Sequence, residues 1–269
     1  MKRTISILLA VLMLASLCTG AYAAELPFTP YDVLDHMDEG DALARTSEDQ
    51  AVNGMCCLVD MLSIAAMVRA TDEEYEYANA CLDRLYDDEA QELSNLQTLA
   101  LGAIQVFNLL ELLAEQEDAN MMNEENREAL RISFNRGDEN AQDAKQQMVN
   151  ALYNSILMAA LIVEEINPSR DVIASVAQEL EDFSRDEDAC RDVSDQMVNG
   201  AYWLQRMLTA MASLLSADEA ITDEIMELSE VNTYNANIQT DLEDELAVWL
   251  YSCVQMAGYY TEELLAEAA

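Results

Sequence analysis

The chain is poor in the residues that interrupt helices and in the residues on which most catalytic sites depend. It has 3 Pro, 7 Gly and a single His, His36, among 269 residues. So few helix breakers predict an all-α protein. One His excludes a multi-His metal site or a His-based triad, except one assembled around His36. The sequence also has no glycine-rich phosphate loop. We therefore expect a protein that is not an enzyme and needs no cofactor.

Positive charge is equally scarce. The chain has 13 Lys and Arg against 52 Asp and Glu, a net charge of −39. Such a surface makes binding to nucleic acid or to an anionic membrane unfavourable, and it suits a basic protein or peptide as partner. It also permits weak binding of divalent cations, although no acidic run has the spacing of a helix-loop-helix calcium loop. A purely solubilising role for the acids is the plainer alternative.

The first 23 residues have the pattern of a secretory signal peptide. Lys2 and Arg3 precede an apolar run, and Ala21-Tyr22-Ala23 is a small-x-small cleavage site. Leu17 before Cys18 is too bulky for a lipoprotein signal. We expect cleavage after Ala23 or Ala24 and export of the rest to the envelope, the periplasm or the medium of a bacterial-type cell, without membrane insertion.

Five cysteines remain after that cleavage. They are Cys56, Cys57, Cys81, Cys190 and Cys253. An odd number cannot all pair within one chain. We expect mostly buried, reduced thiols that behave as small apolar side chains, with one disulfide left open as an alternative.

The most informative pattern is a repeat of about 49 residues. The segments that begin at Gln50, Gln147 and Gln196 each have Val two residues and Asn three residues after the Gln. Two fainter copies begin at Thr98 and Glu245. Eleven residues after four of these starts lies a Met: Met61, Met158, Met207 and Met256. A fixed period of this size indicates tandem supersecondary units. The alternative is that long amphipathic helices merely resemble one another, which does not explain the shared Gln and Asn.

Each repeat is expected to hold a long helix followed by a shorter one. Long helices are predicted near 43–70, 92–117, 138–166, 187–215 and 238–265, and short acidic ones near 72–90, 121–136, 169–185 and 217–232. Capping boxes are predicted at 71–74, 216–219 and 240–243. Residues 24–40, with Pro27 and Pro30, are expected to form an irregular lead-in to a single helical domain over residues 41–269.

Small residues recur at one position of the long helices. Gly54, Gly102, Ala151 and Gly200 share this position, and Trp249 replaces them in the last copy. We expect close approach of neighbouring long helices there. The predicted fold is a tandem helical-hairpin repeat, either a short open α-solenoid, which we favour, or a closed, repeat-built bundle.

The candidate binding residues are amides that recur one helical turn apart. They are Gln50, Asn53, Gln147, Asn150, Gln196 and Asn199. If these faces line a groove, the amides can bond the backbone of an extended peptide. The alternative is that they bond within the protein and set helix register.

These patterns favour a secreted acidic helical-repeat protein that acts as a non-catalytic binding or scaffold module for a basic or extended partner. The alternative from another class is an acid-rich cation-buffering or cell-envelope structural protein.

Overall fold

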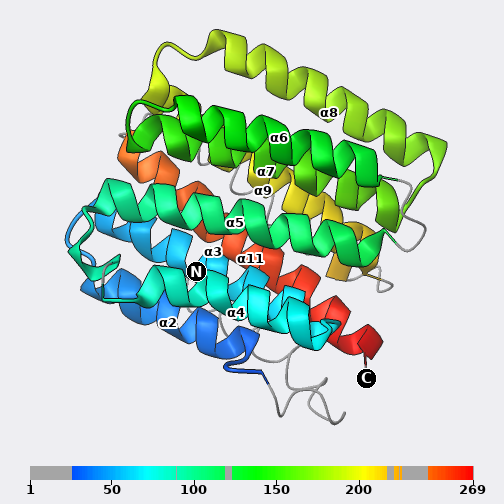
Figure 1. Ribbon diagram of the computed structural model, residues 1–269, viewed down its shortest axis with the longest axis horizontal. Coiled ribbons are helices and arrows are strands. Elements are labelled where there is room, and N and C mark those ends of the chain that lie inside the picture. Colours follow the sequence, from blue (N-terminus) through cyan, green and yellow to red (C-terminus); the bar gives the residue numbers. More distant parts are fainter. Residues whose placement is uncertain are drawn as a thin grey trace.

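The computed structural model describes residues 26–88, 90–118, 123–216, 221–223, 225 and 242–268, and within them the chain is helical and contains no strand. Five long helices are α3 (Ser47–Val68), α5 (Asn95–Glu117), α7 (Ala144–Ile166), α9 (Val193–Leu215) and α11 (Leu242–Ala268). The shorter helices are α2 (Pro30–Leu43), α4 (Asp72–Tyr86), α6 (Glu124–Asn140) and α8 (Arg170–Ala189), with a 3-10 turn η1 (Ala90–Glu92). The predicted all-α class is confirmed (Figure 1).

Local capping explains where the helices begin. Thr71 and Glu74 form the predicted box at the start of α4, in which each side chain accepts a hydrogen bond from the other residue's backbone amide. Reciprocal boxes also open α3 and α5, at Thr46 and Ser94. The boxes predicted at 216–219 and 240–243 include residues outside the described ranges.

The prediction of an irregular lead-in over residues 24–40 was wrong for most of its length. Residues from Pro30 onward form α2, which has Thr29 as N-cap and a capping box with Asp32. Pro30 occupies the first turn, where its missing amide hydrogen has no intrahelical acceptor and its fixed φ angle suits a helix. The proline is therefore a helix start, and His36 lies exposed on this helix.

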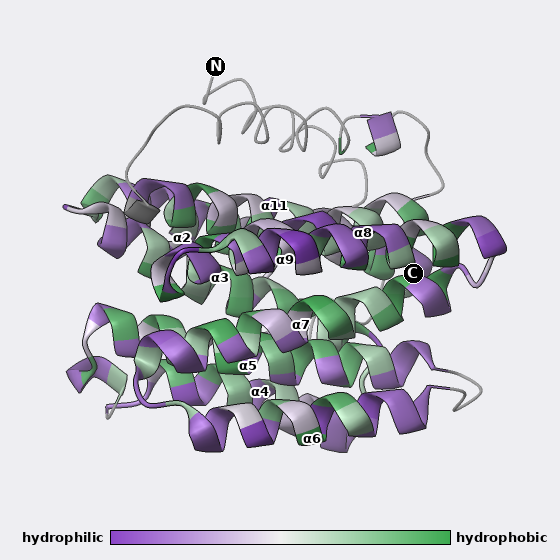
Figure 2. Cartoon of the chain, turned by 90° about the horizontal axis from the view of Figure 1, so that it is seen from above, coloured by the Kyte–Doolittle hydropathy of each residue, from purple (hydrophilic) through white to green (hydrophobic). Residues whose placement is uncertain are grey.

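The long helices contact one another in a closed cycle. α3 packs on α5, α5 on α7, α7 on α9, α9 on α11, and α11 packs on α3 again. The shorter helices lie against the outside of this cycle, and Figure 2 shows hydrophilic residues along α6 and α8. The open solenoid that the sequence favoured is therefore wrong, because the last long helix buries its apolar surface on the first.

Small residues allow the close approach that was predicted. A Cβ atom added to Gly54 would lie 2.6 Å from Tyr251 Cδ1, and one added to Gly200 would lie 3.0 Å from Leu152 Cβ. At Gly102 the added atom would meet Met55 Cγ at 2.4 Å. Side chains of one long helix thus fill the space that glycine leaves on the next.

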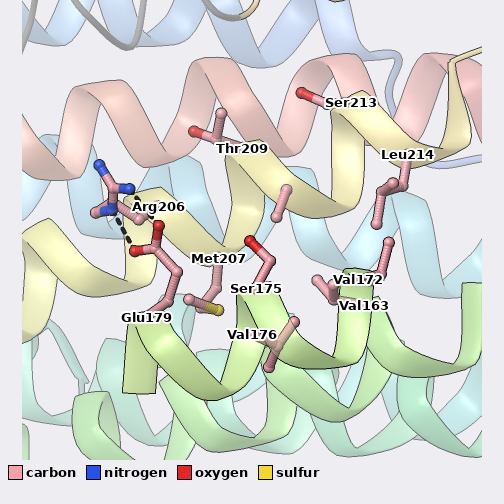
Figure 3. A pocket seen from close by; sticks show the side chains of 11 residues that line it. Val163, Val172, Ser175, Val176, Glu179, Arg206, Met207, Thr209, Ser213 and Leu214 are labelled. Carbon is pink, nitrogen blue, oxygen red and sulfur yellow. Dashed lines mark hydrogen bonds and ion pairs between the residues drawn. The ribbon is translucent and has the colours of Figure 1, made fainter. Parts of the chain in front are cut away.

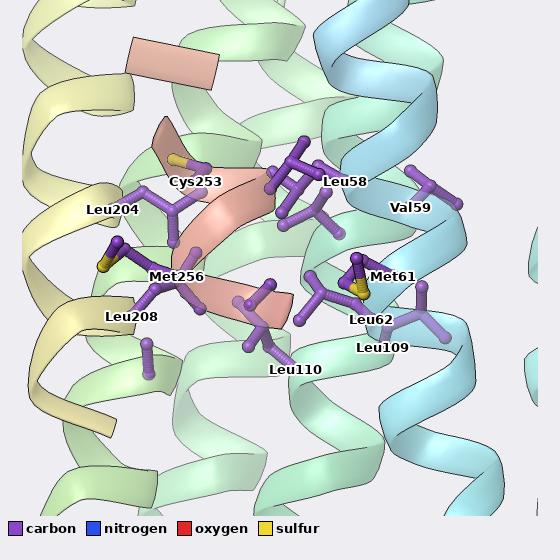
Figure 4. Close-up of a cluster of buried hydrophobic side chains, with 14 of the residues drawn as sticks. Leu58, Val59, Met61, Leu62, Leu109, Leu110, Leu204, Leu208, Cys253 and Met256 are labelled. Atoms are coloured by element: carbon purple, nitrogen blue, oxygen red, sulfur yellow. The ribbon is translucent and has the colours of Figure 1, made fainter. Parts of the chain in front are cut away.

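The core lies inside the cycle of long helices (Figure 4). Residues at the same distance from the five starts noted in the sequence are buried in the core. The residues eleven positions after each start, none more than 1% exposed, are Met61, Leu109, Met158, Met207 and Met256. The next positions along, all 0% exposed, are Leu62, Leu110, Ala159, Leu208 and Ala257.

Three of the described helices are long and apolar enough to cross a membrane, judged by length and composition alone. They are α3, α5 and α7, and the shares of their apolar windows that lie buried inside the protein are 83%, 61% and 56%. Burial on more than one side accounts for their apolar sequences in this fold.

Candidate functional site

The predicted amide residues lie where a short helix meets the long helix that follows it. Asn53 Nδ2 donates to the Met37 carbonyl oxygen of α2 at 2.9 Å, and Asn150 Nδ2 donates to the Phe134 carbonyl oxygen of α6 at 2.9 Å. Both acceptors lie sixteen residues before the donor. Each of these two amides therefore joins a long helix to the short helix that precedes it.

The glutamines repeat the same relation. Gln50 Nε2 donates to Asp41 at 2.6 Å, and Gln147 Nε2 donates to Asp138 at 3.2 Å, in each case nine residues back. Asn53 also donates to the Tyr251 hydroxyl at 3.1 Å, which ties α3 to α11. These side chains are half-buried.

The third asparagine has a different environment. Gly40 and Gly137 make room for Asn53 and Asn150, since an added Cβ would lie 2.0 Å and 1.9 Å from their Oδ1 atoms. The residue thirteen positions before Asn199 is Asp186, where the other two helix pairs have glycine. Asn199 Nδ2 is buried and has no hydrogen bond of normal geometry, although it lies near the Tyr153 hydroxyl. The packing of α8 on α9 is correspondingly sparser than that of α6 on α7.

This arrangement does not support a peptide groove lined by the amides. The amide donors of α3 and α7 bond the short helix that precedes each of them. The amides' internal bonds favour the register-setting alternative. We therefore do not retain them as the candidate site.

Asn150→Ala is expected to lower the free energy of unfolding by about 0.5–1.5 kcal/mol, because it removes the hydrogen bond from Nδ2 to the Phe134 carbonyl oxygen of α6. Asn199→Ala should cost less, since its Nδ2 makes no such bond. Urea unfolding of both variants measures the difference. If both variants lose the same free energy of unfolding, the hydrogen bond to the short helix does not explain the contribution of Asn150 to stability.

The better candidate site is a cavity of about 250 Å³ between α7, α8 and α9. Its walls are mostly apolar, and Figure 3 shows side chains of α8 and α9 facing one another across it. The apolar lining residues are Val163, Val172, Val176, Met207, Ala210 and Leu214. Ser175, Thr209 and Ser213 add hydroxyl groups, and the buried Ser213 Oγ has no hydrogen-bond partner.

One end of the cavity carries an ion pair. Arg206 Nε lies 2.7 Å from Glu179 Oε2, and a second guanidinium nitrogen bonds the other carboxylate oxygen. The guanidinium also lies 5.4 Å from the centre of the Trp203 ring. The hydrogen bonds to Glu179 raise the pKa of Arg206 despite its partial burial. The cavity therefore offers an apolar chamber whose only charges neutralise each other.

Sequence reasoning missed this site. None of its lining residues belongs to the amide series, and its walls come from three helices. The one available signal was Arg206, a rare base three residues after Trp203 of the aromatic pair Tyr202-Trp203.

A second buried polar centre joins α3 to α4. Asp60 is 6% exposed, and the Tyr86 hydroxyl donates to both of its carboxylate oxygens at 2.9 Å. Burial raises the pKa of Asp60 to about 6, partly opposed by Tyr86 and by His36 of α2. No group of three metal-ligating residues occurs in the part of the chain that the structure describes.

The cysteines of the described chain are all free, and Cys57, Cys81 and Cys253 are buried. Burial raises the pKa of Cys56 to about 12 and that of Cys81 to about 11. These thiols are protonated and poorly nucleophilic, in keeping with the predicted packing role.

Comparisons with protein-family models, with curated proteins and with solved structures find no match to this chain.

Proposed function

We propose that this protein is an exported, acidic, non-catalytic binding or scaffold module for a basic partner. The observation that carries the proposal is how the arginines are used. Six of them lie in internal ion pairs: Arg69, Arg127, Arg131, Arg185, Arg191 and Arg206. With a net charge of −39, most carboxylates have no basic partner within the chain. A basic surface supplies that missing charge, and its approach is accelerated by the acidic field.

Binding to a basic partner is tested by pull-down at physiological salt, with the mature protein as bait. The captured partner is then titrated with the mature protein. We expect a saturable, stoichiometric interaction that weakens as salt rises. Diffuse binding without a stoichiometric end point, together with equal binding of any divalent cation, would instead support the cation-buffering alternative.

We further propose that the domain is a closed ring of five tandem units. Support comes from the join between the last and first copies. Tyr251 meets Asn53 and Gly54 there, as Tyr153 meets Asn199 and Gly200 between two internal copies. A closed ring buries the apolar edges that an open array of repeats must cap with polar surface.

Ring closure predicts that the chain tolerates circular permutation. Leu26 and Ala268 line the same cavity at the end of α3, so a short linker can join them. A permutant opened between Asn167 and Pro168, in the exposed turn between α7 and α8, should retain its helix content and unfold cooperatively. Loss of the native helix content in this permutant would contradict a ring in which the five contacts between neighbouring long helices are equivalent.

The acid surface predicts stabilisation by salt. Raising NaCl from about 0.1 M to about 1 M shortens the Debye length from about 10 Å to about 3 Å, so repulsion between carboxylates is screened. We expect the thermal midpoint to rise over this range. A midpoint that falls would mean that internal ion pairs outweigh the unpaired acids.

Export is tested separately by mass spectrometry of the mature N-terminus, which should begin at Ala24 or Glu25. A lipid-modified Cys18 at the N-terminus would overturn the proposed processing.

A further inference from the structure

The cavity between α8 and α9 opens to the solvent at one side and is lined by buried apolar side chains at the other. Ser175, on its rim, is exposed, whereas Val176 and Met207 behind it are 4% and 1% exposed. Ser175 projects from α8 into the space between the two helices (Figure 3). A cavity of about 150 Å³ is large enough to bind benzene. The space of about 250 Å³ therefore suits one aromatic or branched aliphatic side chain.

The charges around the cavity favour a cationic ligand. Asp171 is exposed and lies one helical turn before the lining residue Ser175, on the same side of α8. The chain as a whole carries a net charge of −39. A cation at this rim would be attracted by Asp171 and by the acidic surface around it.

The one base in the cavity does not make it an anion site. Arg206 is engaged by both oxygens of Glu179 and is covered by the Trp203 ring. A carboxylate ligand would have to displace Glu179 and approach an acidic surface.

We propose that this cavity receives one large apolar side chain from a basic polypeptide segment, whose flanking Lys or Arg residues bind the acids of the rim. This deepens the proposed function and rests on it, because it assigns the basic partner a docking site. The apolar side chain supplies affinity and position, and the rim charges supply selection for a basic sequence.

The test uses two synthetic peptides and two variants of the mature protein. One peptide has a central Phe flanked by alternating Lys and Ala, and the other has Ser in place of the Phe. Ser175→Phe fills the cavity mouth from α8. Ala174→Phe adds the same ring at the adjacent exposed position, which does not line the cavity. Titration calorimetry measures binding, and circular dichroism checks that both variants keep their fold.

We expect the native protein and Ala174→Phe to bind the Phe peptide about ten-fold more tightly than the Ser peptide, since burying a Phe ring is worth at least that factor. The Ser175→Phe variant should bind both peptides with the same affinity, which should equal the weak affinity of the native protein for the Ser peptide. Equal binding of the two peptides to the native protein would overturn the docking site and leave the proposed function standing. Saturable binding of neither peptide would count against the proposed function itself. Equally tight binding of a Phe peptide with Gly and Ser flanks would overturn the role of the rim acids.

Discussion

Replacing Met256 by alanine should lower the free energy of unfolding by about 2–5 kcal/mol. Met256 is 0% exposed and lies in the central apolar cluster, where α11 packs between α3 and α9 (Figure 4). Truncation removes buried apolar atoms and leaves a void that closely packed neighbours cannot fully close. Met61→Ala and Met158→Ala, at corresponding positions of α3 and α7, should cost similar amounts if the five units are equivalent.

Leu43→Ala is the matched control for the methionine series, because this side chain is 80% exposed at the end of α2. Its effect should stay within about 0.5 kcal/mol. Denaturant unfolding followed by circular dichroism measures all four variants. A cost for Met256→Ala as small as that of Leu43→Ala would show that α11 is not part of the core, and ring closure would fail with it.

The protein should be more stable near pH 5 than near pH 8, with Asp60 as a main cause. Burial raises the pKa of Asp60 from 3.8 to about 6, and burial together with Glu263 raises the pKa of Glu262 from 4.5 to about 7. Folding therefore favours the protonated forms. Their contribution to stability is full below the unfolded pKa values and is lost as pH rises through about 6 and 7. Below about pH 4 the trend should reverse, because hydrogen bonds lower the pKa values of Asp32, Asp49 and Asp195.

Asp60→Asn should accordingly stabilise the protein by about 1–3 kcal/mol at pH 8 and have little effect at pH 4, because one pKa unit corresponds to about 1.4 kcal/mol. Tyr86→Phe should act in the opposite direction at pH 8, since it removes the donor to both carboxylate oxygens. Asp38→Asn, on the exposed face of α2, is the control for removing one charge. If Asp38→Asn stabilises as much as Asp60→Asn, general repulsion rather than burial explains the pH dependence.

Much of the helical architecture could be predicted because it depends on residues close together in the chain. Thr71 and Glu74 lie three residues apart and determine the start of α4 through their own backbone. The apolar pattern of the long helices predicted their burial, and the recurrent Gly predicted their close contacts. The error at α2 was also local, because Pro30 was treated as a breaker although Thr29 and Asp32 already provide a capping box.

The candidate site could not be predicted, because it depends on which helices become neighbours. Val163, Ser175 and Met207 line one cavity but belong to three helices, and no local pattern relates them. The amide series shows that residues with the same sequence pattern can differ in their tertiary contacts. The sequence indicated that Asn53, Asn150 and Asn199 are equivalent, yet Asn199 Nδ2 makes no bond like the one that the other two make to the preceding short helix.

The sequence by itself determined the all-α class, the start of α4 and the net acidic charge, because capping, periodicity and charge act within a few residues. Only the tertiary structure decided that the long helices close on themselves. The hydrogen bond from Asn53 to Tyr251 joins residues 198 positions apart, and the same apolar faces would also suit an open row. Closure follows from burying the two exposed faces at the ends of that row against each other, and that contribution to the hydrophobic free energy belongs to the whole chain rather than to any segment.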